Sequence, residues 1–295
     1  MRVNPNPLPD LISAIAQTQQ QINTDLEQIA SGQSINRPSD NPAGAALLVR
    51  NAGKTAETDQ FLRSASGISG GMQNADSALS SVITILQRAI SLGIEGANGT
   101  VNASNRAAVA AEVQGIQSEL LSLANLSYQG NFVFAGTATQ TAPYVLDSTT
   151  PSGVRYVGNS GVNAVTVGDH LAVKTNLPGS QLFSAAGADV FQAIQDLITN
   201  LQSGSNIDAA VNEVSNAYQH INAQRVFYGN AINQLNSQQT FLNDQTNQLA
   251  EQANTVGGAD LSKVISDLVN AQTAREATLG AVSKTQQTNL FDYIK

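Results

Sequence analysis

A seven-residue repeat toward the C-terminal end constrains this chain more than any other feature. Every seventh residue from position 207 to position 256 is apolar, and these residues are Ile207, Val214, Ile221, Tyr228, Leu235, Leu242, Leu249 and Val256. The companion series, offset by four, is apolar at one end and includes polar residues such as Arg225 and Gln239. The pattern predicts one long helix with a single buried seam. At 1.5 Å per residue this helix would be about 75 Å long, so we expect an elongated molecule.

Other amphipathic patterns predict the remaining helices. They cover residues 9–31, 43–94 and 104–126, a segment that begins at Asp189, and a last segment that begins at Asp260. Residues suited to begin or end these helices are Gly32, Ser39, Asp40, Ser104, Asn105 and Gly204. Because the seven-residue register breaks after Val256, the last helix is expected to be separate from the long one.

Between two helical stretches the sequence turns to short β-rich runs separated by turns, for example at residues 154–157 and 164–167. We therefore predict a mainly α fold with a small β insert, arranged as an elongated antiparallel helical bundle or coiled coil with its N- and C-terminal segments paired. The expected parts are an N-terminal assembly helix and turn (1–44), the first half of a helical body (45–131), the inserted β domain (132–186), the second half of the body (187–256) and a C-terminal assembly helix (257–295).

Composition argues against several classes of partner. The net charge of −8 and the pI near 4.6 disfavour nucleic acid, because a phosphate-binding surface needs clustered Lys and Arg. We find no apolar run near the ~20 residues of a membrane helix, so we expect no membrane partner. The first residues also lack the apolar core and cleavage site of a secretory signal.

The sequence lacks the patterns of an active site. The absence of cysteine removes thiol catalysis and cysteine-ligated metals. His170 and His220 have no metal-ligand spacing, and no nucleophile elbow or phosphate-binding glycine loop occurs. We predict no catalytic, cofactor-binding or metal residues, no cofactor and no enzymatic activity.

An interface is the function that remains. The flanks of the long seam carry mostly uncharged amides, which suggests that its partner comes from the same chain. Each terminal segment has an apolar stripe, and a lone amphipathic helix of this length is marginal in water. We therefore expect loosely ordered ends that fold when they are covered. The candidate assembly residues are Leu8, Ile12, Ile15, Ile22, Leu26, Ile29, Leu261, Ile265, Leu268, Leu279 and Val282.

Motifs at both ends are similar to those of a known family. Residues 29–44, with Ile29-Ala30-Ser31-Gly32 and Ala43-Gly44, resemble the N-terminal signature of the bacterial flagellin superfamily, and segments between residues 86 and 125 continue the resemblance. Three further stretches, 37–42, 132–137 and 289–295, resemble the members of that superfamily that join the flagellar hook to the filament.

The resemblance implies a flagellin-type bundle with a structural role. Such a protein is secreted to the flagellum through the flagellum's own type III export apparatus, without a cleaved signal peptide and with an export chaperone. It would join hook-associated protein 1 to flagellin and contact copies of itself in the axial assembly through its terminal helices. Two alternatives stay open, namely filament flagellin itself and a secreted binding protein that uses the β insert.

Overall fold

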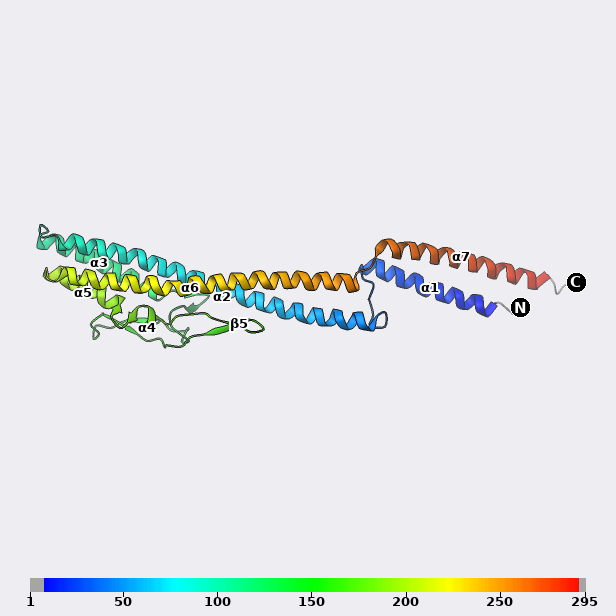
Figure 1. Cartoon of the computed structure of the whole chain (residues 1–295), viewed down its shortest axis with the longest axis horizontal. Helices are drawn as coiled ribbons and strands as arrows, with labels where there is room; N and C mark the ends of the chain where they lie inside the picture. Colours follow the sequence, from blue (N-terminus) through cyan, green and yellow to red (C-terminus); the bar gives the residue numbers. More distant parts are fainter. Residues whose placement is uncertain (1–7, 292–295) are drawn as a thin grey trace. The chain divides into compact units, whose positions relative to one another are not determined.

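The structure, a computed structural model, describes residues 8–291 and consists mainly of helices (Figure 1). The helices are α1 (Leu8–Ser31), α2 (Pro42–Ala97), α3 (Ala103–Ala124), α4 (Gly179–Leu182), α5 (Val190–Ser203), α6 (Ile207–Gly257) and α7 (Leu261–Phe291). The strands are β1 (Ser127–Tyr128), β2 (Asn131–Phe132), β3 (Tyr144–Leu146), β4 (Val154–Tyr156), β5 (Ala164–Gly168), β6 (Leu171–Lys174), β7 (Ser184–Ala185) and β8 (Ala188–Asp189). The prediction of a mainly α fold with a small β insert is confirmed.

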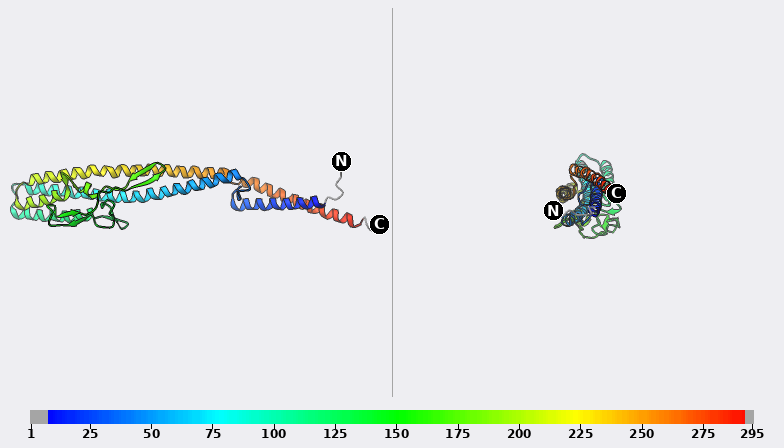
Figure 2. Two further views of the ribbon diagram at one scale, coloured as in Figure 1. Left: turned by 90° about the horizontal axis from the view of Figure 1, so that it is seen from below. Right: turned by 90° about the vertical axis from the view of Figure 1, so that its right-hand side faces the viewer.

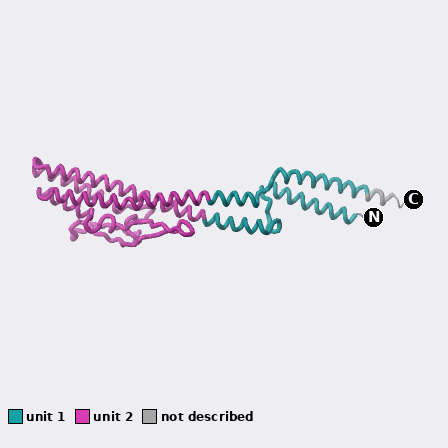
Figure 3. Tube along the Cα trace, in the orientation of Figure 1, with its two compact units in different colours: residues 1–57, 245–295 teal, residues 58–244 magenta. Residues whose placement is uncertain are grey.

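The chain divides into two compact units, which Figure 3 draws in different colours. Unit 1 takes in residues 1–57 and 245–295, and unit 2 takes in residues 58–244. Helices α1 and α7 belong to unit 1, and the hairpins with α3 and α5 belong to unit 2. Helices α2 and α6 contribute residues to both units.

The seven-residue series of α6 lies in the core of unit 2. Its members there are buried, and they are Ile207, Val214, Ile221, Tyr228, Leu235 and Leu242. All but the last share one apolar cluster with side chains of α2, α3 and α5. The Tyr228 hydroxyl accepts a hydrogen bond from the Leu177 backbone N–H at 3.2 Å, and burial raises the pKa of this phenol. The expected seam is confirmed, and its partners come from the same chain.

The polar break in the companion series has a specific partner on α2. Arg225 Nε and Nη2 donate to the two carboxylate oxygens of Asp76 at 2.6 and 2.9 Å. The two side chains are 35% and 26% exposed, so water screens the pair only in part. A two-pronged pair of this kind constrains the rotation of α6 against α2 within unit 2.

Helix α2 meets the length and hydropathy criterion for crossing a membrane, which the sequence argument did not anticipate. Core helices meet the same criterion, and 39% of the apolar window of α2 is buried inside the structure. Its buried residues include Leu79, Val82 and Leu86, which belong to the core cluster of unit 2. A Cβ placed on Gly93 would overlap the Val211 side chain, so glycine permits the close packing of α2 on α6 here.

The β insert consists of four two-stranded antiparallel ladders, which pair β1 with β2, β3 with β4, β5 with β6, and β7 with β8. Side chains rather than a continuous sheet hold this region together. Tyr144 lies 4.9 Å from Phe191 of α5, and Phe134 meets Phe183 edge-on at 5.3 Å between ring centroids. The aromatic cluster therefore joins the hairpins to the helices of unit 2.

One glycine in the middle of α2 has a packing role. The helix continues through Gly67, Gly70 and Gly71. A Cβ on Gly70 would lie 2.6 Å from the Tyr128 hydroxyl oxygen. Because Tyr128 is in β1, glycine here allows the first hairpin to approach the helix closely.

Several helix caps differ from the expected ones. Asn41 caps α2, since its Oδ1 accepts from the Gly44 N–H at 2.9 Å, whereas Asp40 accepts from the N–H groups of Asn36 and Arg37 in the preceding loop. Asn102, two residues before Ser104, caps α3. The helix starts expected at Asp189 and Asp260 and the helix end at Gly204 are confirmed, and both aspartates accept backbone N–H groups of the first turn. Asparagine is as good a cap as Ser or Asp, so local sequence did not decide between neighbours.

In unit 1, α1 and α7 lie side by side, as Figures 1 and 2 show. Backbone hydrogen bonds fasten the segments where α1 ends and α7 begins. Ser34 N–H donates to the Gly257 carbonyl at 2.7 Å, and Ala259 N–H donates to the Gly32 carbonyl at 3.0 Å. Gly32 has φ of +68°, the left-handed conformation expected just after a helix. These bonds hold the two terminal helices at a common base.

The buried seam predicts a large difference between two substitutions on α6. Leu235→Ala should lower the free energy of unfolding by about 2–5 kcal/mol, because it removes fully buried apolar atoms and leaves a cavity. Phe241→Ala, at a side chain that is 59% exposed on the same helix, should change it by less than about 0.5 kcal/mol. Denaturant unfolding followed by circular dichroism measures both. Similar losses in the two variants would contradict the assignment of the seam.

Candidate assembly interface

Helix α1 has two apolar faces with different surroundings. Ile22 and Asp25 are its buried residues, and Ile15 and Ile29, each seven residues from Ile22, are half-buried beside them. Spacings of three, four and seven place these side chains on one face of a helix. This inner face is the one covered by α7, with which α1 makes its main packing contact.

Helix α7 supplies the matching inner face. Val264 and Ala271 are buried, and Leu268 and Val282 are half-buried. These positions recur at three, four, seven and eleven residues, the spacing of one helical stripe. The predicted residues Ile15, Ile22, Ile29, Leu268 and Val282 are thus used within the chain, where they hold the α1–α7 pair together.

Except for Leu8, the other predicted residues flank the inner stripes, three or four residues from a member of the stripe, and stay open to solvent. Ile12, Leu26, Leu261, Ile265 and Leu279 are between 45% and 61% exposed. Leu8, at the first described position, is half-buried. Val269, 54% exposed and four residues after Ile265, extends the stripe and was missed by sequence reasoning, although the spacing could have identified it. We call Ile12, Leu26, Leu261, Ile265, Val269 and Leu279 the outer apolar face.

The expected pairing of the N- and C-terminal segments is confirmed, and this pairing covers the inner face. Each terminal helix is the other's partner, and the loop segments around Gly32 and Gly257 bring them together. The outer apolar face is different, because these large side chains remain in contact with solvent. Exposed apolar residues gathered on one helical stripe indicate a surface that is covered in another setting.

Charge distinguishes the two helices. Helix α1 contains Asp10, Asp25 and Glu27 but no Lys or Arg, so its side chains carry a net charge of −3. Helix α7 carries Lys263, Arg275 and Lys284 against two acidic residues, which gives +1. The helices are therefore of opposite sign, which favours their pairing at low ionic strength.

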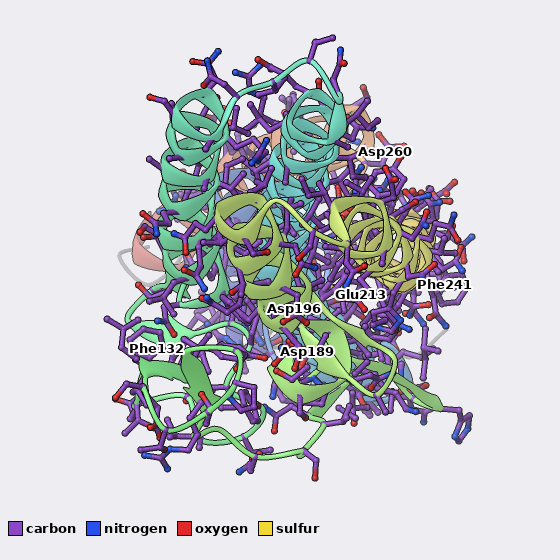
Figure 4. The ribbon with its side chains drawn as sticks, turned by 90° about the vertical axis from the view of Figure 1, so that its left-hand side faces the viewer. Phe132, Asp189, Asp196, Glu213, Phe241 and Asp260 are labelled. Atoms are coloured by element: carbon purple, nitrogen blue, oxygen red, sulfur yellow. The ribbon has the colours of Figure 1, made fainter. Side chains whose placement is uncertain are left out.

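Unit 2 contains a carboxylate cluster that sequence reasoning did not identify. Figure 4 shows Asp189, Asp196 and Glu213 near one another, and they line a cavity of about 220 Å³ between α5 and α6. Gln192 Nε2 donates to both oxygens of Asp196 at 2.9 Å. Glu213 is exposed, but its partial desolvation and the neighbouring Asp196 carboxylate raise its pKa, and burial raises the pKa of Asp189. The three residues lie 24 positions apart at most, but only the packing of α5 on α6 brings them together.

The histidines do not form a reactive site in the described part of the chain. His220 Nε2 lies 2.8 Å from the Gln181 carbonyl oxygen, which fixes the imidazole against α4, and His170 is exposed in the turn between β5 and β6. Among residues 8–284, whose side chains the structure describes, no group of three or more His, Cys, Asp or Glu side chains is arranged to hold a metal ion.

Comparison with known proteins now defines the class. Residues 10–139 match the family model described as the bacterial flagellin N-terminal helical region. The chain therefore carries that region, and the resemblance and the flagellin-type fold expected from its motifs are confirmed. Flagellar hook-associated protein 3 of Escherichia coli (strain K12) is 26% identical over 291 residues, covering 91% of this chain and 92% of that protein.

Other flagellar proteins are also similar to this chain. Flagellin of Listeria monocytogenes is 26% identical over 273 residues, covering 89% of this chain and 87% of that protein. The solved structure of a flagellar hook-associated protein from Vibrio parahaemolyticus has a TM-score of 0.68 at 20% identity, and the match covers 74% of this chain and all of that one. The flagellar junction protein of Legionella pneumophila has a TM-score of 0.62 at 14% identity, covering 72% and 100%. The two structural similarities define the fold, and the relatives point to a structural rather than a catalytic role.

The carboxylate cluster predicts a specific pH dependence. A carboxyl whose pKa is raised in the folded state contributes stability below its unfolded pKa and loses that contribution as the pH rises. Glu213→Gln should therefore raise the melting temperature at neutral pH, and the difference should shrink as the pH falls toward about 4. Glu119→Gln, at a carboxyl of α3 that lies outside this cluster, is the control. A Glu213→Gln variant that melts at or below the wild-type temperature at pH 7 would contradict this.

Proposed function

We propose that this chain is a structural subunit of the bacterial flagellum that joins the hook to the filament. The observation that supports the proposal most directly is the outer apolar face of the α1–α7 pair. A relative named hook-associated protein 3 that aligns along nearly the whole chain gives the setting in which this face would be covered.

Energetics favour assembly through this face. Complete burial of a large aliphatic side chain contributes roughly 1.5–3 kcal/mol, and the side chains of the outer apolar face are about half exposed in the single chain. Covering six of them therefore provides several kcal/mol before the entropy cost of association. That cost falls for each subunit that joins neighbours already in place, because the partner surfaces are then held together.

The proposed partners follow from this position in the flagellum. The subunit contacts copies of itself, hook-associated protein 1 toward the hook and flagellin toward the filament. It is secreted by the flagellar type III apparatus without a cleaved signal peptide, and an export chaperone shields its apolar ends beforehand. Residues 1–44 and 257–295 form the inner tube, residues 45–131 and 187–256 the surrounding layer, and residues 132–186 the outer surface.

Flagellin itself is the second candidate function, because Listeria monocytogenes flagellin also aligns over most of the chain. A filament subunit polymerises without limit, whereas a junction subunit stops after a short segment. Electron microscopy of the concentrated purified protein should show short polymers or none. Long filaments formed by this chain alone would favour flagellin over a junction protein.

Single substitutions test the outer apolar face. Ile265→Asp should abolish function in a strain that lacks this protein, because a carboxylate would be buried without a partner on assembly. Such cells should resemble the deletion strain, which we expect to keep hooks, shed flagellin into the medium and not swim. Circular dichroism of the purified variant should match the wild type, since Ile265 is half exposed in the single chain.

Leu146→Asp is the matched control, since Leu146 is 79% exposed on β3 and lies outside the proposed interface. This variant should restore swimming. Full motility of the Ile265→Asp strain, with normal amounts of exported protein, would argue against assembly through the outer apolar face.

A further inference from the structure

An asparagine–glycine pair lies in the turn between α2 and α3. Asn98-Gly99 is the one such pair in the sequence, and residues 98–100 are all exposed. A Cβ placed on Gly99 would meet nothing within 4 Å, and the φ angle of Gly99 is not positive. Neither packing nor backbone conformation therefore requires glycine at this position.

The side-chain oxygen of Asn98 accepts two hydrogen bonds from one residue. Thr100 donates to Oδ1 through its backbone N–H at 3.2 Å and through its hydroxyl at 3.0 Å. Both bonds make the amide carbon more electrophilic, and both stabilise negative charge that develops on Oδ1. Asn98 Nδ2, by contrast, has no hydrogen-bond partner among the described residues. The oxygen is thus held in place, while the amide nitrogen is free to leave.

Asn159 in the β insert provides a comparison within the same chain. Its Oδ1 also accepts two backbone N–H groups, from Thr137 at 2.8 Å and from Gly161 at 2.9 Å. Its Nδ2, however, donates to the Thr137 hydroxyl at 2.8 Å, and the next residue is Ser160, whose Cβ shields the backbone nitrogen. The glycine and the free amide nitrogen therefore distinguish Asn98 from Asn159.

We propose that Asn98 is a site of spontaneous covalent modification in the folded chain. The backbone nitrogen of Gly99 loses its proton to hydroxide or water and bonds to Asn98 Cγ. The bond from Cγ to Nδ2 then breaks, and Nδ2 takes up a proton and leaves as ammonia. Between these two steps Oδ1 carries the negative charge, at the atom to which both Thr100 groups donate. Water opens the resulting succinimide ring at either carbonyl, which gives aspartate or isoaspartate.

Both products disturb the turn. An aspartate at position 98 places a carboxylate three residues after Glu95 and at the negative end of the α2 dipole, and both effects are unfavourable. In isoaspartate the main chain runs through the former side chain. The former backbone carbonyl, which accepts from the Val101 N–H at 2.9 Å, then becomes the free carboxylate. Modification therefore loosens the connection between α2 and α3, whatever the function of the chain.

Peptide mapping by mass spectrometry of the full, folded chain tests the proposal. In mildly alkaline buffer, where the Gly99 nitrogen loses its proton more readily, the amide of Asn98 should convert to a carboxyl before that of Asn159. Thr100→Val removes the hydroxyl donor but keeps the N–H, and it should slow conversion roughly two- to tenfold, since one hydrogen bond is lost. Thr100→Ser keeps the hydroxyl and should convert like the wild type. Gly99→Ala should lose most of the conversion and keep the fold, because there is space for its Cβ.

The same measurement in denaturant separates the folded turn from the local sequence. The wild type and Thr100→Val should convert at equal rates there, because the turn is lost. Folded Thr100→Val that converts as fast as the wild type would overturn the proposal, as would conversion of Asn159 ahead of Asn98. Equal slowing of Thr100→Val in the folded and unfolded chains would contradict the role given to the turn.

Discussion

Each terminal helix carries apolar side chains around more of its circumference than one partner helix can cover. When α1 and α7 pack together, Ile22 and Val264 leave water, but Ile12 and Ile265, which flank the inner stripes, do not. Because one partner helix covers only some of these side chains, pairing within the chain leaves others exposed. The inner face brings the two ends of the chain together, and the outer face remains available to other molecules. A single chain therefore buries only part of the apolar surface of its terminal helices.

In unit 2, by contrast, helices of the same unit cover the apolar side chains of α6. The seam of α6 is fully covered because α2, α3 and α5 surround it, and the Arg225–Asp76 pair accommodates the polar break. Its packing contrasts with that of the terminal pair, where a buried carboxylate takes a place that an apolar residue could fill. The proposed assembly role would use the sparsely packed pair, while the well-packed unit would keep its shape.

Sequence periodicity predicted the helices well, because an uninterrupted series such as Ile207 to Leu235 can be satisfied only by a helix with one covered face. The pairing of the N- and C-terminal segments was predicted and is confirmed. Individual side-chain contacts between distant segments, such as Tyr128 against Gly70 and the carboxylates around Glu213, depend on tertiary packing and could not be predicted. For the same reason, the sequence could not predict which residues of the assembly stripe are covered and which are exposed. Val269 could have been predicted as part of the stripe, since it follows Ile265 by one turn.

Thiol reactivity tests the central claim most directly, because the chain has no cysteine of its own. A single Ile265→Cys variant would be treated with a maleimide, once as the free chain and once within isolated flagella. Leu146→Cys would report on general access. The account predicts that the thiol introduced at position 265 reacts rapidly in the free chain and is protected in flagella, while the one at position 146 reacts in both. Equal reactivity at position 265 in the two states would contradict the claim that neighbouring subunits cover the outer apolar face.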